Sequence, residues 1–165
     1  MVRSASVLTL VILVAATAVS AQSPPSMPGM PSMPAGPIMV TPDQIKWMDG
    51  PPSFAPGLKM AMLQGNMAQA GPYAVRLQFP ANYKVPAHFH PNMEHVTVIS
   101  GTFYFGLGNK LNEAEGKPYP PGSFVAVPPN TPHFAYAKEE TVVQVHSTGP
   151  GGLTYVDPAD DPRKK

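Results

Sequence analysis

The sequence has no cysteine and few charged residues. Its 165 residues include no Cys and only 13% Asp, Glu, Lys and Arg. The absence of cysteine excludes disulfide bonds, thiolate nucleophiles and Cys-ligated zinc, so stability must come from a hydrophobic core, with or without a metal ion. The 11 basic and 10 acidic residues nearly balance. Without an excess of positive charge, nucleic acids and anionic membranes are not expected partners.

Long apolar runs are also scarce, and the one that exists lies at the N-terminus. Arg3 precedes an apolar run from Val7 to Ala16, and the small residues Val19-Ser20-Ala21 follow. This order is typical of a secretory signal peptide, which predicts residues 1–21 as a cleaved leader and an exported protein, periplasmic or extracellular. An uncleaved membrane anchor is the alternative. After cleavage no membrane partner is expected.

A Pro/Met-rich segment without charges follows, from residue 22 to 41. Its dense prolines rule out a helix or a sheet ladder, which predicts a disordered linker. Met27, Met30 and Met33 recur every third residue, and thioethers suit Cu(I), but no His or Cys accompanies them, which favours a plain spacer. We expect one domain over residues 42–160, with Trp47 as a packing anchor, and a basic tail over residues 161–165, whose closing Arg163-Lys164-Lys165 is expected to be solvated.

The domain consists of short β-type segments separated by Gly and Pro. The clearest is Tyr73–Phe79, in which apolar residues alternate with Ala74, Arg76 and Gln78. Residues 94–99 and 102–106 flank a Ser100-Gly101 turn, which predicts a hairpin, and residues 107–121 are expected to be a loop. Further strands are expected at 57–63, 123–127, 133–137, 140–146 and 153–156, with a short strand or turn at 43–48. Without a persuasive long helix, the pattern predicts an all-β sandwich or closed barrel.

Histidine is concentrated in one part of the chain. All five histidines lie between residues 88 and 146, and His88-Phe89-His90 is followed by Glu94. Side chains two apart on a strand point to the same face, so His88 and His90 can share a ligand. His133, which follows a Pro-stiffened turn, can join them. Imidazoles with a carboxylate form a metal site, and half-exposed surface histidines are the alternative.

These spacings resemble those of the cupin superfamily. In the first cupin motif, a Gly precedes His-x-His, Glu and a second Gly, and here His88, His90, Glu94 and Gly101 match, while Asn82 replaces the first Gly. In the second motif, Gly122, Pro128 and His133 match, whereas Asn130 replaces a Gly and Ala137 replaces an Asn. Asn tolerates a left-handed backbone, so both Gly-to-Asn changes are mild.

The resemblance implies a double-stranded β-helix, or jelly-roll barrel, with one divalent transition metal bound by His88, His90, Glu94 and His133. Three nitrogens and one oxygen suit a tetrahedral Zn²⁺ or an octahedral Fe²⁺, Mn²⁺, Ni²⁺ or Co²⁺. The resemblance implies that the octahedral arrangement is the more usual. Glu94 is the catalytic candidate, since a detached carboxylate can act as a base.

Several further residues are pocket candidates. Alternation places Arg76 with Gln78, and Gln144 with His146, so each pair lies either inside the barrel or on its exposed face. Tyr136 belongs to a group of aromatic residues expected to pack in the barrel, with one or two at the cavity mouth. His95, next to Glu94, should point away from the metal.

Three functions fit these expectations. The first is a metalloenzyme acting on a small molecule, dioxygenase-like by resemblance, or else an isomerase or lyase. The second is a non-catalytic module that binds or senses a metal or small ligand, and the third is a structural or storage barrel. The resemblance also suggests a homodimer.

Overall fold

The computed structural model describes residues 36–165, and within them the chain is built from short strands. The strands are β1 (Met48–Asp49), β2 (Lys59–Gln64), β3 (Gly71–Phe79), β4 (Lys84–Phe89), β5 (Glu94–Ser100), β6 (Phe103–Leu107), β7 (Lys117–Tyr119), β8 (Phe124–Val127), β9 (His133–Ala137), β10 (Thr141–Gly149) and β11 (Thr154–Tyr155). Three 3₁₀ turns complete the regular structure: η1 (Pro42–Gln44), η2 (Pro158–Asp160) and η3 (Pro162–Lys164). None of the helices in this range is both long and apolar enough to cross a membrane.

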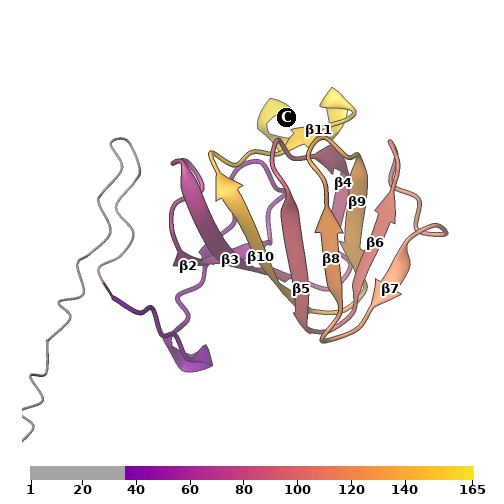
Figure 1. Ribbon diagram of the computed structural model, residues 1–165. Coiled ribbons are helices and arrows are strands. Elements are labelled where there is room, and N and C mark those ends of the chain that lie inside the picture. Colours follow the sequence, from indigo (N-terminus) through magenta and orange to yellow (C-terminus); the bar gives the residue numbers. More distant parts are fainter. Residues whose placement is uncertain (1–35) are drawn as a thin grey trace, which may run out of the picture.

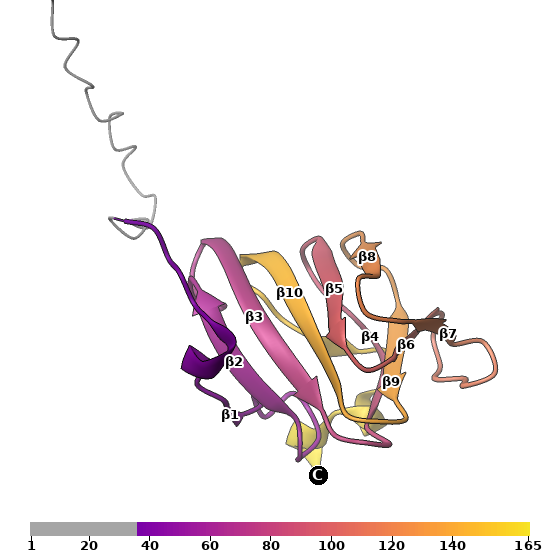
Figure 2. The same ribbon diagram turned by 90° about the horizontal axis from the view of Figure 1, so that it is seen from below.

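The strands form two antiparallel sheets that face each other (Figures 1 and 2). The first sheet has the order β1-β2-β3-β10-β5-β8, and the second has the order β11-β4-β9-β6-β7. Consecutive strands often lie in different sheets, which is the arrangement of a jelly roll. The predicted all-β, double-sheet barrel is confirmed.

The core lies between the two sheets. In β3 the residues Tyr73, Val75, Leu77 and Phe79 are buried, as the alternation predicted. They pack against apolar residues of the other strands, namely Val96, Val98, Phe103, Phe105, Val143 and Val145. This apolar interior surrounds the site described below.

The predicted hairpin between residues 94–99 and 102–106 is wrong, because β5 and β6 belong to different sheets. The turn at Gly101 carries the chain from one sheet to the other. Gly101 has φ +69°, and a Cβ atom there would lie 2.3 Å from the carbonyl oxygen of Glu140. Only glycine fits this close approach, so the Ser-Gly signal marked a crossing between sheets and not a hairpin.

Two other expectations about the fold are also wrong. Residues 117–119, predicted as part of a loop, form the edge strand β7, with Pro118 opposite Tyr104. Proline is tolerated there because an edge strand leaves one side of its backbone unpaired. Trp47, the predicted packing anchor, is 37% exposed beside the two-residue strand β1.

The two asparagines that replace motif glycines adopt the backbone that glycine favours. Asn82 has φ +63° and Asn130 has φ +57°. Each therefore performs the conformational role of the missing glycine, as expected from the tolerance of Asn for this region. The loops before β4 and before β9 keep the geometry that delivers the histidines.

The C-terminal residues fold back onto the barrel and end close to β11, at the top of the view in Figure 1. Asp161 is only 7% exposed, and its carboxylate accepts hydrogen bonds from Arg163. The closing residues Arg163, Lys164 and Lys165 are themselves exposed, as the expected solvated tail requires. The predicted signal peptide and most of the linker lie outside the described residues, and residues 36–41 belong to no strand or helix.

Candidate metal centre

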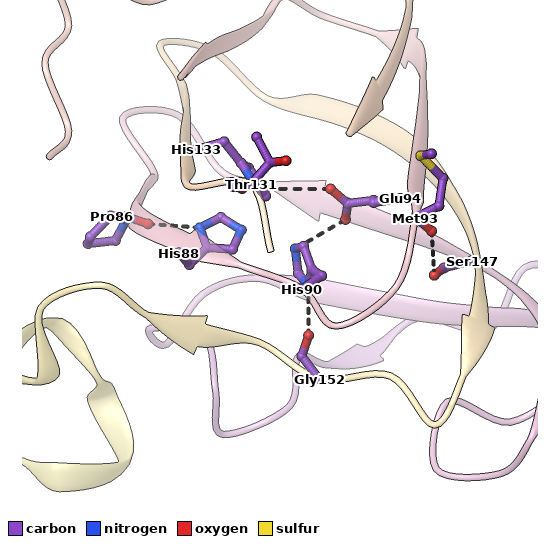
Figure 3. A network of polar contacts seen from close by, with 9 residues as sticks. All are labelled: Pro86, His88, His90, Met93, Glu94, Thr131, His133, Ser147 and Gly152. Atoms are coloured by element: carbon purple, nitrogen blue, oxygen red, sulfur yellow. Dashed lines mark hydrogen bonds and ion pairs between the residues drawn. The ribbon is translucent and has the colours of Figure 1, made fainter. Parts of the chain in front are cut away.

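Three histidines meet inside one end of the barrel (Figure 3). His88 in β4 lies directly opposite His133, the first residue of β9, and their ring centroids are 4.2 Å apart. His90, just beyond the end of β4, lies 4.9 Å from His88 and 5.3 Å from His133 by the same measure. One ligand nitrogen from each ring falls within 4.8 Å of the others. Strand pairing and the end of β4 therefore bring together imidazoles that are 45 positions apart at most in the sequence.

The backbone holds each imidazole by its Nδ1 atom. The Nδ1 atoms of His88, His90 and His133 lie 2.8, 2.7 and 2.9 Å from the carbonyl oxygens of Pro86, Gly152 and Thr131. A carbonyl oxygen only accepts hydrogen bonds, so each Nδ1 carries the proton and donates it. Each Nε2 is therefore left with a free lone pair, as in histidines that bind metals.

Glu94 approaches this cluster from the opposite sheet. Its Oε1 lies 3.5 Å from Nε2 of His90, and its Oε2 lies 3.6 Å from Nε2 of His133. Although Glu94 follows His90 by only four residues, β4 and β5 lie in different sheets, and residues 90–93 cross between them. The crossing allows a carboxylate to face imidazoles that it could not reach across a flat hairpin.

The environment keeps the buried imidazoles neutral. Burial, followed by the charges of His133 and His90 when protonated, holds the pKa of His88 well below its ordinary value of 6.5. Burial also lowers the pKa of His133, partly against the opposing effect of its hydrogen bond to Thr131. Neutral imidazole is the form that binds a metal ion.

The donors fit a cation between them. Within residues 36–165, the Nε2 of His90 is the one buried side-chain nitrogen or oxygen without a hydrogen-bond partner. The three histidines and Glu94, together with apolar core residues, line a space of about 30 Å³. It is large enough for a water-sized occupant. An orphaned lone pair, a carboxylate and a small adjoining space are what a first-row divalent ion requires.

A larger cavity of about 250 Å³ lies beside the histidine cluster. His90 and Glu94 belong to its lining, so a molecule in this cavity would touch the candidate metal centre. Most of its walls are apolar, and they are formed by Phe54, Met60, Met67, Val75, Leu77, Val145 and Leu153. Tyr73, Ser53 and Arg163 supply polar groups. An apolar cleft with a few polar groups is typical of a small-molecule site.

The geometry of this site can be compared with known proteins. The model of the ChrR cupin-like domain matches residues 35–151, which is more than half of the chain. The chain belongs to this cupin family. The matched residues include the three histidines and Glu94, so the cluster lies within the family domain. A search of curated proteins finds no match for this cupin.

Solved structures give the same fold at low sequence identity. The polyketide cyclase RemF from Streptomyces resistomycificus is 16% identical, with a TM-score of 0.64, over 76% of this cupin and 89% of that chain. A provisionally assigned acetylacetone dioxygenase from Methylibium petroleiphilum is 20% identical, with a TM-score of 0.59, over 81% and 90%. An RmlC-like cupin from Shewanella frigidimarina is 19% identical, with a TM-score of 0.53, over 68% and 91%. At these identities the likeness shows the fold alone.

The polar pocket candidates of the first sheet lie on its outer face. Gln144 pairs with Arg76 and Thr97, and His146 pairs with Ala74 and His95. Gln78 shares the face of Arg76. Neighbouring residues of β3 and β10 point into the core, so alternation turns these four side chains outward. Arg76, Gln78, Gln144 and His146 therefore do not line the cavity of the cupin.

Tyr136, the fifth pocket candidate, lies on the outer face of the second sheet. It stacks on Tyr104 with ring centroids 4.7 Å apart, and its hydroxyl donates to the carbonyl oxygen of Glu113. It is buried by the loop before β7 and not by the barrel interior. His95 lies on the outer face of the first sheet, as predicted, and stacks on Phe124.

Sequence reasoning missed the residues that complete the site from the C-terminal side. Gly152 orients His90 through its carbonyl oxygen, and such a backbone contact has no residue pattern. Tyr155 packs 6.1 Å from the ring of His88, and its hydroxyl donates to the carbonyl oxygen of Ser53. Burial raises the pKa of Tyr155 to about 12, so it remains a donor at neutral pH. The strand predicted at 153–156 could have suggested that this segment forms a wall of the cavity. It could not have shown which of its side chains face the metal centre.

Proposed function

We propose that His88, His90, Glu94 and His133 bind one divalent transition metal ion and that the protein is a small-molecule metalloenzyme with dioxygenase-like chemistry. The observation that carries this proposal is the convergence of three deprotonated Nε2 atoms, each fixed by a backbone hydrogen bond, on a space bordered by a carboxylate. The imidazoles are oriented to bind a cation with Nε2 and not to accept hydrogen bonds there, because no donor in the described residues reaches the Nε2 of His90.

The donor set narrows the identity of the ion. Three imidazole nitrogens and one carboxylate oxygen suit Fe²⁺, Mn²⁺, Ni²⁺, Co²⁺ or Zn²⁺, and they disfavour ions that prefer sulfur. When bound, such an ion supplies Lewis acidity or O₂ activation. The four protein donors leave further positions open if the ion is octahedral.

The surrounding residues have separate roles in this proposal. The carbonyl oxygens of Pro86, Gly152 and Thr131 fix the imidazoles, and the apolar walls of the large cavity exclude water from the bound molecule. Glu94 compensates charge, and its carboxylate, 15% exposed at the cavity wall, can accept a proton from a substrate.

The alternative is a non-catalytic metal-binding or small-ligand-binding module. The cavity of about 250 Å³ beside His90 and Glu94 disfavours a purely structural metal site, which needs no such space, but a ligand-binding module would share it. Turnover of a bound molecule separates the enzyme from a ligand-binding module, and exchangeable water at the ion separates it from a structural metal site. Proton relaxation of the Mn²⁺-loaded protein should reveal water exchanging at the ion, whereas a closed structural site would show none.

Metal analysis tests the proposal itself. Anaerobically purified protein should carry about one transition metal ion per chain, or take up one from a panel of the five ions. The loaded protein should then consume O₂ in the presence of a substrate from a library of small organic molecules. Protein that remains metal-free with every ion of the panel would refute the metal centre.

Export and dimerisation are parts of the same proposal. The N-terminal sequence supports secretion with cleavage after Ala21, and N-terminal sequencing of the mature protein tests it. Exposed apolar side chains on the first sheet, including Ile99 and Phe124, support a homodimer. Sedimentation at micromolar concentration should give twice the mass of the chain.

A further inference from the structure

The segment after residue 151 forms one wall of the large cavity, although it lies beyond the part of the chain that the family model matches. Gly152 holds His90, Leu153 lines the cavity, and Tyr155 packs beside His88. The end of this segment brings one charged residue, Arg163, to the same cavity. The ligand preference of the cavity therefore depends on residues specific to this C-terminal segment.

Arg163 is held in a fixed orientation. Its Nε and Nη2 atoms donate to the two carboxylate oxygens of Asp161 over 2.7 and 2.8 Å, and Nη2 also lies 3.4 Å from the carbonyl oxygen of Leu153. Asp161 additionally accepts the backbone N–H of Arg163. These contacts use three of the five guanidinium N–H groups. The two on Nη1 have no acceptor among residues 36–165 and remain available to a ligand.

Exposure shows which end of the cavity Arg163 occupies. Its side chain is 44% exposed, whereas the side chains of His90 and Glu94 are 19% and 15% exposed. Arg163 therefore lies toward the mouth and the metal centre toward the bottom. A ligand that contacts both must place a group that accepts hydrogen bonds at the mouth and its reacting part inside.

The walls between these two ends are suited to an apolar body. They include Phe54, Met60, Met67 and Val145. The volume of about 250 Å³ exceeds the roughly 150 Å³ of an apolar protein cavity that binds benzene. One ring with a short chain, or an aliphatic body of similar size, therefore fits.

We propose that Arg163 is the specificity-determining residue for a small apolar monocarboxylic acid, whose carboxylate it binds at the mouth while the body of the ligand reaches toward His90 and Glu94. The inference names the substrate class of the function proposed above and rests on it. A guanidinium donates charge-assisted hydrogen bonds to a carboxylate, which are stronger than those to a neutral carbonyl. The apolar walls between the two ends offer no partner for a second charged group.

The size of the preference follows from the pairing of Arg163. Asp161 offsets part of the positive charge of Arg163. The binding free energy that a ligand carboxylate gains there is therefore that of a charge-assisted hydrogen bond, and is smaller than that of a carboxylate facing an unpaired buried cation. We therefore expect a preference on the order of tenfold for an acid over its uncharged amide.

Calorimetric titration with 3-phenylpropanoate and 3-phenylpropanamide tests the proposal on the full protein. The acid should bind about tenfold more tightly than the amide. Equal affinities, or no binding of either probe, would overturn the proposed ligand class. The comparison uses unmodified protein, so it does not depend on whether a variant folds.

A matched pair of variants then assigns the preference to Arg163. Arg163→Met should abolish the preference for the acid while leaving amide binding within about twofold, and Lys164→Met, which removes the neighbouring positive charge, should leave the preference intact. A preference that survives in Arg163→Met, or is lost in Lys164→Met, would contradict the assignment. Titrations repeated after chelation separate this inference from the proposed metal function, because the contacts of Arg163 do not involve the ion.

Discussion

The barrel carries two groups of polar side chains on its strands. One group faces the interior, and the other lies on the outer face of the first sheet. The inner group is His88, His90 and His133, and the outer group is His146 with Gln144 and Arg76. Inside, every Nδ1 is bound to a backbone carbonyl, and every Nε2 points to one space. Outside, Arg76 Nε donates to Gln144 Oε1 over 3.0 Å, and the amide nitrogen of Gln144 lies 3.3 Å from Nε2 of His146.

The comparison shows that residue type alone does not make a site. The outer side chains satisfy one another and water, so nothing there calls for a ligand. In the inner group, the Nε2 of His90 is the one buried side-chain nitrogen or oxygen of residues 36–165 without a hydrogen-bond partner, and leaving such an atom unpaired is costly. The inner arrangement therefore makes physical sense with a cation present, and each prediction below contrasts the two groups.

Replacing an inner histidine should have the largest effect. We expect His133→Ala to abolish metal loading, because it removes one of the three nitrogen donors that surround a small space. His146→Ala, on the outer face, should load as much metal as the unmodified protein. Elemental analysis of both variants after identical loading provides the measurement.

Circular dichroism and thermal melts of both variants serve as the control, because His133→Ala also leaves a cavity in the core. Full metal occupancy in a folded His133→Ala protein would remove the histidine cluster from consideration as the metal centre.

Changing Glu94 to Gln should have a smaller effect on binding than the loss of a histidine. The amide keeps the shape of the side chain but loses the negative charge that faces His90 and His133. We expect the affinity for the ion to fall roughly tenfold or more, and any O₂ consumption to be lost even at full loading. Competition with a chromogenic chelator measures the affinity.

Glu139→Gln is the matched control for Glu94, since Glu139 is an exposed carboxylate far from the cavity lining. Glu139→Gln should change neither the affinity for the ion nor O₂ consumption. If Glu94→Gln retained both affinity and O₂ consumption, then Glu94 would be neither a ligand nor a base.

The sequence predicted the parts of the site that depend on strand alternation and motif spacing. His88 and His90 converge because they are two residues apart at the end of one strand, and the positive φ of Asn82 and Asn130 preserves the loops that deliver them. Residues 73–79 alternate as expected. These features are local, and local geometry is what a residue pattern records.

The failures concern contacts that no local pattern records. Alternation placed Gln144 and His146 on one face but did not state which face was outer. The Ser100-Gly101 turn was ambiguous between a hairpin and a crossing, and only the packing of Gly101 against Glu140 decided it. The carbonyl oxygen of Gly152, which orients His90 from the C-terminal side, corresponds to no residue pattern at all. In each case the deciding interaction lies between sheets or between a sheet and a terminus.

The smallest effect is expected on the outer face. Gln144→Ala removes the amide that links Arg76 to His146, but all three positions remain near water, which can replace the lost partner. We expect the free energy of unfolding, measured by urea denaturation, to fall by about 1 kcal/mol or less, with metal loading unchanged. A variant that loses its metal would show that the outer side chains hold β10 in the position the inner site requires. The two faces would then be mechanically coupled, and the separation between a functional interior and a merely solvated exterior would no longer hold.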